Sequence, residues 1–574
     1  MKKTIVNAPK DPTKKRPYLY ILHNKDIQGA PQSDGSFTHY LYMDMGRLQD
    51  AARLTGNLTD EKMLKDMETA RGFKEIVNSI GVSVSSAEPA KKVRFVAEMY
   101  PTVPGEDATV IEEDITMDGM ETVIDFAGLE LKPTDRVLGQ FRFEFDTEGL
   151  QASADVRLYL NDGYEAPEQF EDSDVDTDSP AYKAMIAKSL MQTGNIARVK
   201  KVLEKAGSGE DVTLAFIGGS ITQGAGAVPI NEKCYARVFY EDFVKRYMKG
   251  GECTFVKAGI GGTPSELGMI RFERDVLRDG AAKPDMIVIE FAVNDGDDET
   301  EGICYESLVR KALALPWKPA VVLLFSVFSN DWNLQDRLSP VGRKYDLPMV
   351  SVLDAVSPQF PLLPKDGRVI SKNLFFYDVY HPTNIGHKIM ADCLMNCMDS
   401  ISMMNDIPED ALNVEEIKPA IGADFETVEL LDRKELSKLS SKYDIEGVSE
   451  GPFDKEDKDL QCAEIDKSIT LVPQFPYNWH YDGSGYSKSF KMTAVCSRLL
   501  LIFKDSDRGE FGTAEILVDG KAVRDADPHV NNWTHCNAVL ILNEEKSCRH
   551  EIEISMKHGM EDKKFTILGF GIVK

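Results

Sequence analysis

The stretch VTLAFIGGSIT, residues 212–222, decides the fold: a short apolar run of β-forming residues ends in two glycines and a serine. A continuous apolar run of this length is typical of a strand that is buried on both faces of a parallel sheet. Because Gly218 and Gly219 allow a tight turn, we expect Ser220 to stand exposed where a helix begins. Ser220 is therefore placed like a nucleophile.

Four further apolar runs follow, separated by segments with helical spacing. The strand candidates are residues 254–258, 286–291, 320–325 and 349–352, and the helix candidates between them include residues 235–248 and 305–315. This repeated strand–helix order predicts an α/β domain with a doubly wound, flavodoxin-like parallel sheet and right-handed crossovers. Ligands of such sheets bind beyond the carboxyl ends of the strands, so the residues after each strand are the candidates for function.

Segments with alternating apolar residues flank this domain. A chain of 574 residues exceeds the size at which one core stops growing, about 250–300 residues, so several domains are expected. The predicted division is an N-terminal β-rich domain at 1–164, an acidic linker at 165–180, the α/β domain at 181–408 and a C-terminal β-sandwich-like domain at 409–574. Helical spacing inside the flanks predicts an insert at 46–80 and one helix at 434–443.

The composition excludes several classes of partner. The formal net charge of −27 opposes binding to nucleic acid and to anionic membranes, which are recognised largely through Lys and Arg. No apolar run reaches the roughly 18–20 residues that span a bilayer, and no apolar segment follows the basic N-terminus, so no secretion signal is expected. Nine scattered cysteines without a Cys-x-x-Cys pair fit a reducing compartment. We therefore expect a cytoplasmic protein, with a homo-oligomeric state left open.

Three further blocks carry reactive or polar groups at the expected strand ends. The second strand is followed by GIGGT, residues 259–263, whose backbone amides can face an oxyanion, and the third strand ends just before Asn294. After the last strand, Asp378 stands three residues before His381, just ahead of a predicted helix. In this reading His381 takes the proton of Ser220, and Asp378 orients the imidazole ring.

These four blocks, in this order, resemble the SGNH branch of the GDSL esterases and lipases, over roughly residues 181–397. The resemblance implies a serine esterase with Ser220 as nucleophile and with Asp378 and His381 as its partners. It also implies an oxyanion hole formed by the backbone amide of Ser220, the amide of Gly262 and the side chain of Asn294. Gly261 is the competing register for the glycine. No metal or organic cofactor is implied, because acyl transfer needs only the triad and the oxyanion hole.

Two positions depart from the family pattern: Gly219 stands where the name-giving Asp is found, and Ala292 stands where Gly is usual. Neither change removes a reacting group. A dinucleotide fingerprint is excluded because its third glycine would fall at Pro264. His387 has no neighbouring carboxylate or cysteine cluster in the sequence that would support a metal site. Glu290, inside the third strand, is expected to be buried and paired.

Three features favour a carbohydrate O-acetyl ester as the substrate. No apolar lid helix stands out, as an enzyme for long acyl chains would need, and the β-rich flanks resemble accessory modules of polysaccharide esterases. Aromatic residues that can stack on sugars have polar neighbours in predicted loops, and Trp332 is the foremost candidate for substrate binding. The other aromatic candidates are Tyr477, Trp479, Tyr481 and Trp533. Packing inside the protein is their alternative role.

Two other functions stay open at this stage. The enzyme could act as an acyl esterase, lysophospholipase or thioesterase on another small ester. Alternatively, the chain could be a catalytically inactive glycan-binding scaffold, although the four intact residues Ser220, Asn294, Asp378 and His381 argue against it. For a cytoplasmic enzyme, the expected partner is an acetylated oligosaccharide that has been imported.

Overall fold

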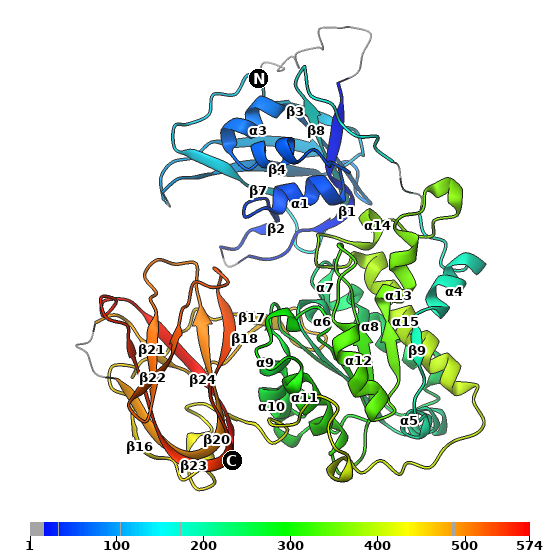
Figure 1. The fold of residues 1–574 in the computed structure, drawn as a ribbon. Helices are drawn as coiled ribbons and strands as arrows, with labels where there is room; N and C mark the ends of the chain where they lie inside the picture. Colours follow the sequence, from blue (N-terminus) through cyan, green and yellow to red (C-terminus); the bar gives the residue numbers. More distant parts are fainter. Residues whose placement is uncertain (1–15, 33, 104, 171, 173, 485–488) are drawn as a thin grey trace.

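The computed structural model describes residues 16–574 apart from residues 33, 104, 171, 173 and 485–488. Three parts follow one another along the chain: a β-sandwich, a mixed α/β part with a parallel-strand sheet, and a second β-rich part (Figure 1). The coarser prediction, a mixed α/β fold with a parallel-strand sheet and β-rich regions, is confirmed. None of the described helices is long and apolar enough to cross a bilayer.

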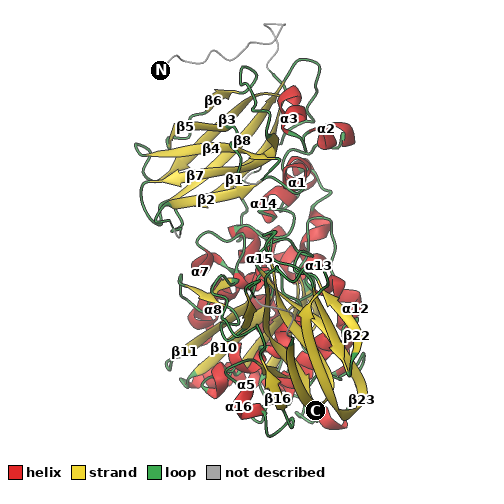
Figure 2. Ribbon diagram, turned by 90° about the vertical axis from the view of Figure 1, so that its left-hand side faces the viewer, coloured by secondary structure: helices red, strands yellow, loops and turns green. Residues whose placement is uncertain are grey.

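Two four-stranded antiparallel sheets share one apolar core in the N-terminal part (Figure 2). One sheet contains β1 (Tyr18–Gln28), β8 (Gln151–Leu160), β3 (Val77–Ser86) and β6 (Thr122–Asp125), and the other contains β2 (Phe37–Tyr42), β7 (Asp135–Phe145), β4 (Lys92–Pro101) and β5 (Val110–Thr116). Every second residue of β8 is buried, so the sequence alternation builds a half-buried strand. The predicted insert contains the helices α1 (Arg47–Leu54), α2 (Glu61–Asp66) and α3 (Ala70–Ile76).

Five parallel strands form the centre of the middle part, and an antiparallel strand closes one edge. The order along the sheet is β11 (Cys253–Gly259), β10 (Val212–Gly218), β12 (Met286–Glu290), β13 (Ala320–Phe325), β14 (Met349–Ser351) and β9 (Leu190–Gln192). Every residue of β12 and β13 is buried, which explains their continuous apolar sequence. Strand β9 has no predicted counterpart, because three half-buried residues make too short a signal.

Helices cover both faces of this sheet. One face is covered by α5 (Ala197–Ser208), α8 (Tyr235–Tyr247), α13 (Val352–Val356) and α15 (Asn384–Ser402), and the other by α9 (Ser265–Ile270), α10 (Phe272–Asp275), α11 (Ile303–Leu313) and α12 (Gln335–Lys344). The core of the second face also includes Leu500, Ile502 and Leu568 of the C-terminal part. The C-terminal part therefore packs directly on this helix layer.

One eight-stranded sheet builds most of the C-terminal part and encloses its own apolar core. Its main path is β15 (Glu429–Leu431), β24 (Phe565–Val573), β20 (Phe490–Asp505), β23 (His535–Met556), β21 (Ala514–Val518) and β22 (Lys521–Ala526), with β16 (Glu446–Ser449) beside β20 and β19 (Trp479–Tyr481) beside β24. The helix predicted at 434–443 is wrong in length. Only α16 (Leu436–Leu439) forms; residues 440–444 are turns, with Asp444 at φ 44°, and lead into β16.

Candidate active site

The turn after β10 places Ser220 at the first residue of the short helix α6 (Ser220–Gln223). The two preceding glycines are required by close packing. A Cβ at Gly218 would lie 2.2 Å from Oγ1 of Thr222, and one at Gly219 would lie 2.3 Å from Oδ1 of Asn294. The departure from the family pattern at Gly219 thus makes room for the Asn294 side chain.

Ser220, His381 and Asp378 form one hydrogen-bonded row. Nε2 of His381 lies 3.0 Å from Oγ of Ser220, and Nδ1 of His381 lies 2.8 Å from Oδ2 of Asp378. The other Asp378 oxygen accepts the backbone amides of Tyr380 at 2.8 Å and His381 at 2.9 Å. The structure therefore brings together the three residues that the sequence proposed as a set.

The electrostatics of His381 suit a base. Burial of the ring by itself would lower the pKa of His381, but the charge and the hydrogen bond of Asp378 outweigh this effect and raise the pKa above its usual value. With Nδ1 donating to Asp378, Nε2 is free to accept the Ser220 proton. The arrangement can therefore activate a serine hydroxyl.

The sequence suggested that the loop with Asp378 and His381 directly follows the last strand, but in the structure it does not. It lies between α14 (Lys372–Phe375) and α15, well after β14 has ended, because α13 and α14 intervene. The amide of Tyr377 donates to the carbonyl of His381 at 2.7 Å, which closes the loop into a tight turn. Thr383 then caps α15 through the amide of Gly386 at 3.1 Å.

Three donors near Ser220 are available for an oxyanion. Within the described chain, neither the amide of Ser220 nor that of Gly262 donates a hydrogen bond, and the Asn294 side chain has no hydrogen-bond partner. The amide of Gly261, in contrast, donates to Oε1 of Gln223 at 2.8 Å. This contact favours Gly262 over Gly261 as the oxyanion donor, and Gln223 is a residue that sequence reasoning missed.

The C-terminal part supports the same glycine loop. Nε2 of His535 lies 3.0 Å from the Gly262 carbonyl, and Nε2 of Gln461 donates to the Gly261 carbonyl at 2.7 Å. A Cβ at Gly262 would lie 2.9 Å from the Trp533 ring, so the glycine, with φ 68°, is required here. Sequence reasoning named Trp533 among the aromatic candidates but had no signal that the C-terminal part contacts this loop.

The aromatic candidates separate into two groups. Trp479 and Tyr481 are buried in the C-terminal core, with 1% and 3% exposure, so their role is packing. Tyr477 and Trp533 are exposed. Trp332 is partly buried and stacks on Phe328, with ring centroids 5.8 Å apart, at the same sheet edge as Asn294.

Glu290 is buried and paired, as expected, directly behind the nucleophile turn. Its carboxyl group accepts hydrogen bonds from Thr222 Oγ1 at 3.0 Å and from the Ser326 hydroxyl. Burial raises the pKa of Glu290 to about 7, although both hydrogen bonds oppose the shift. Glu290 thereby ties the α6 turn to the end of β13.

The N-terminal sandwich also contacts the loop that carries Asp378 and His381. The fully buried Lys25 of β1 donates to the carbonyl of Phe376 at 2.7 Å and to that of Asn373. Nε2 of His39, on β2, lies 2.6 Å from the hydroxyl of Tyr377. These contacts join residues more than three hundred positions apart, which no local sequence pattern reveals.

Replacement of Lys25 by Met is expected to destabilise this contact. The two buried carbonyls would lose their donor, which costs about 1–3 kcal/mol for each unsatisfied group, and a shifted loop would lower kcat by about tenfold or more. The midpoint of urea unfolding and the rate of ester hydrolysis measure the two effects. Lys62→Met, at a lysine with 82% side-chain exposure, is the matched control. Unchanged stability and kcat in Lys25→Met would mean that the sandwich does not support the loop.

Comparisons with known proteins support an ester hydrolase. Residues 216–389 match the model of the GDSL-like Lipase/Acylhydrolase family. The chain is also similar to the solved structure of a two-domain esterase (CEX) active on acetylated mannans, with 27% identity, a TM-score of 0.55, and coverage of 68% of this chain and 99% of that chain. The same esterase co-crystallised with mannopentaose gives 27% identity, a TM-score of 0.54, and coverage of 68% and 98%. No curated protein sequence matches the chain.

Proposed function

We propose that this protein, an ester hydrolase whose middle part belongs to the GDSL-like lipase/acylhydrolase family, removes O-acetyl groups from carbohydrates by a serine mechanism. The observation that carries the proposal is the hydrogen-bonded row of Ser220, His381 and Asp378 beside three uncommitted donors. The similarity to an esterase active on acetylated mannans supports a carbohydrate ester as the substrate class.

In the proposed mechanism, His381 takes the proton of Ser220 as its oxygen attacks the acetyl carbonyl. The amides of Ser220 and Gly262 and the side chain of Asn294 donate to the oxyanion of the tetrahedral intermediate. His381 then gives the proton to the leaving sugar hydroxyl, and an acetyl-serine remains. A water molecule, deprotonated by His381, attacks this ester and releases acetate. Asp378 holds the ring orientation and stabilises the imidazolium throughout.

The substrate assignment is tested with 4-nitrophenyl acetate, butyrate and octanoate, followed by acetate release from acetylated manno-oligosaccharides. We expect fast turnover of the acetate ester, little turnover of the octanoate ester, and acetate release from the sugar. A preference for octanoate would contradict the proposal and favour a lipid or thioester substrate. Absence of turnover together with retained sugar binding would favour an inactive scaffold.

The oxyanion hole yields a further prediction. Asn294→Ala should lower kcat by about 10²–10³-fold with little change in KM, because the lost donor acts mainly in the transition state. Gly219→Ala should have a similar effect, because its Cβ would lie 2.3 Å from Oδ1 of Asn294 and displace that side chain. The double variant should be no slower than either single variant. Additive losses in the double variant would show that Gly219 acts independently of Asn294.

A cytoplasmic location is part of the same proposal and rests on the cysteines. All nine are free thiols, and burial raises the pKa of Cys393 and Cys397 to about 12. Such thiols are poor nucleophiles and suit a packing role. The substrate at this location would be an oligosaccharide taken up by the cell.

A further inference from the structure

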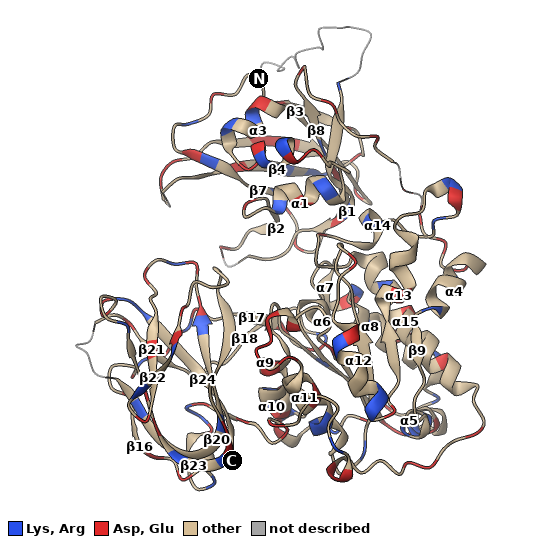
Figure 3. Cartoon of the chain, viewed as in Figure 1, with Lys and Arg blue, Asp and Glu red and all other residues tan. Residues whose placement is uncertain are grey.

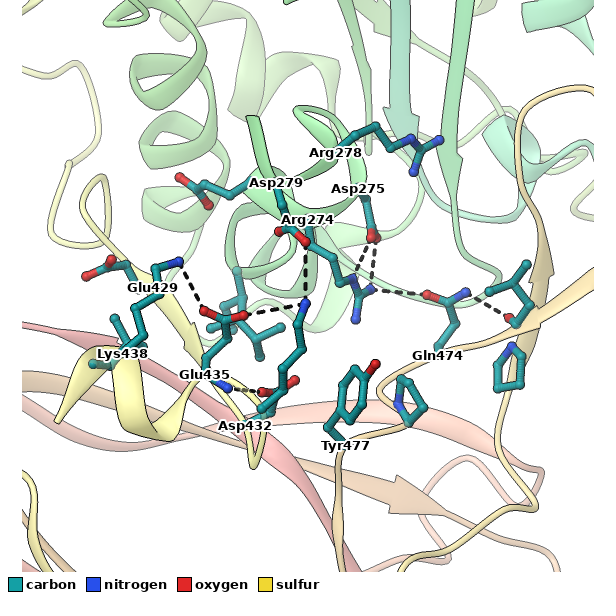
Figure 4. A pocket seen from close by; sticks show the side chains of 18 of the residues that line it. Arg274, Asp275, Arg278, Asp279, Glu429, Asp432, Glu435, Lys438, Gln474 and Tyr477 are labelled. Carbon is teal, nitrogen blue, oxygen red and sulfur yellow. Dashed lines mark hydrogen bonds and ion pairs between the residues drawn. The ribbon is translucent and has the colours of Figure 1, made fainter. Parts of the chain in front are cut away.

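One cavity of the described chain lies between α10 and the C-terminal part and has a volume of about 290 Å³ (Figure 4). Its charged side chains are paired with one another. Arg274 contacts Asp275 at 2.5 Å and Gln474 at 3.1 Å, and Lys434 contacts Asp279 at 3.5 Å. The residues that line this cavity therefore form a charged contact between two parts of the protein, and we assign no ligand to it.

A second cavity, of about 180 Å³, lies between the N-terminal sandwich and the loop that carries Asp378. We call it the seam pocket. Its walls are formed by β1, β2 and α1 on one side and by residues 377–380 on the other. Figure 1 shows these elements of the sandwich next to the end of the middle part that carries α6 and α14. The seam pocket therefore opens beside the candidate active site.

Two exposed tyrosines face this pocket from opposite sides. Tyr42 of β2 is 52% exposed, and Tyr380, which directly precedes His381, is 49% exposed. Leaving large aromatic rings in water forgoes the free energy of their burial, so two such rings on one pocket indicate a binding surface. Tyr40 stacks on Tyr42, with ring centroids 6.0 Å apart and an angle of 8° between the planes.

The aromatic surface continues toward the nucleophile. Tyr380 contacts Phe328 edge-on, with centroids 5.0 Å apart, and Phe328 stacks on Trp332 at 5.8 Å. A Cβ at Gly296, two residues after Asn294, would lie 3.3 Å from the Trp332 ring. An aromatic row therefore connects the Asn294 loop, through Tyr380, to the seam pocket.

Hydrogen-bonding groups complete the pocket. Arg47 and Asp50 of α1 line it, and their charges influence Tyr380: burial mainly raises the pKa of its phenol, Asp50 adds to the rise, and Arg47 opposes it. Arg47 also lies 5.9 Å from the centre of the Tyr42 ring and pairs with Asp44 at 2.9 Å. Flat aromatic faces beside a guanidinium and a carboxylate match a sugar, which presents C–H faces and hydroxyl groups.

The two walls of the pocket are held in fixed relation. Lys25 and His39 bind the loop from the sandwich, and Oδ2 of Asp26 accepts from Nδ2 of Asn384 at 2.7 Å, at the start of α15. The contacts of Lys25 and His39 are buried or partly buried, that of Asp26 is exposed, and the three come from both sheets of the sandwich. A pocket with such walls needs little ordering when a ligand binds.

We propose that the seam pocket is a sugar-binding subsite that holds a unit of the oligosaccharide beyond the acetylated one. This inference rests on the proposed function for the identity of the ligand. The N-terminal sandwich then extends the substrate site, with Tyr42 and Tyr380 stacking on the sugar and Arg47 and Asp50 binding its hydroxyl groups. Long substrates gain affinity from this subsite, and short ones do not reach it.

The test uses the full-length chain and the variant Tyr42→Ala, with Val110→Ala as the control because Val110 of β5 is 44% exposed on the same sandwich and does not line the seam pocket. The kcat/KM for long acetylated manno-oligosaccharides should fall about tenfold, or about 1.4 kcal/mol, in Tyr42→Ala. The values for 4-nitrophenyl acetate and for acetylated monosaccharide should not change. Equal kcat/KM values in Tyr42→Ala and Val110→Ala on every substrate, or an equal loss in Tyr42→Ala on all substrates, would overturn the subsite.

A binding measurement separates this inference from the proposed function. Calorimetric titration of unacetylated manno-oligosaccharide into the Ser220→Ala variant should give saturable binding that Tyr42→Ala and Arg47→Gln weaken. If this binding pattern holds but the wild type releases acetate from no sugar, the proposed function is refuted and the subsite is not. Absence of binding, or binding that neither substitution weakens, would refute the subsite.

Discussion

Ser220→Ala is expected to lower kcat for 4-nitrophenyl acetate and for acetylated sugar by at least about a thousandfold. The hydroxyl of Ser220 lies 3.0 Å from Nε2 of His381, and the variant keeps the backbone amide that serves the oxyanion hole but removes the attacking oxygen. KM should change little, because the missing atom acts in the transition state. Steady-state kinetics of both proteins, each purified without carry-over of the other, measure the loss.

The matched control for this experiment is Ser449→Ala, because Ser449 is an exposed serine at the end of β16 in the C-terminal part. Its rate should equal that of the wild type. A covalent test adds a second readout: rapid quenching of the wild type should trap an acetylated peptide that contains Ser220, and the variant should yield none. Equal slow rates in wild type and Ser220→Ala would show that the hydrogen-bonded row is not catalytic.

Asp378→Asn is expected to lower kcat by about 10³–10⁴-fold, because the amide no longer holds the imidazole in the tautomer that accepts the serine proton. The substitution also changes the pH dependence. In the wild type, Asp378 raises the pKa of His381, so kcat/KM should be full above that pKa and fall as the pH drops through it. Without the charge of Asp378, burial lowers the pKa of His381, and the acidic limb should move to lower pH.

Profiles of kcat/KM against pH for the wild type and Asp378→Asn measure this shift. The free energy of unfolding depends on pH in the opposite sense to kcat/KM. The folded pKa of His381 is raised, so the pair with Asp378 stabilises the fold fully below the unfolded value, about 6.5, and this contribution is lost as the pH rises through the folded pKa. An acidic limb that stays in place in Asp378→Asn would exclude Asp378 as the group that tunes His381.

Many elements of the middle part could be predicted because its strands are buried on both faces. Such strands read as continuous apolar runs, as in β12 and β13, and their glycine-rich ends show where the chain turns out of the sheet. Strand β8, in which every second residue is buried, could be predicted equally well from its alternating sequence. The edge strand β9 escaped prediction, and the helix at α16 was predicted too long, because edge and surface segments bury too little to impose a pattern.

The residues of the candidate site also fall into those that could be predicted from the sequence and those that could not. Ser220, Asn294, Asp378 and His381 stand out in sequence because reactive groups follow strand ends or precede a helix at short spacing. Gln223 and Gln461 have no such signal. Gln223 accepts a hydrogen bond from the amide of Gly261, and Gln461 donates one to the Gly261 carbonyl. These contacts favour Gly262 over Gly261 as the oxyanion donor.

The sequence by itself determined the α/β core, the β-rich flanks and the four blocks of the candidate site, because these depend on local periodicity and on neighbouring residues. Only the tertiary structure decided that Lys25 supports the loop of Asp378, that His535 contacts Gly262, and that Tyr42 and Tyr380 line one pocket. Such contacts join residues from different domains. They follow from how packed surfaces meet, and the shape of a packed surface depends on all of its side chains together.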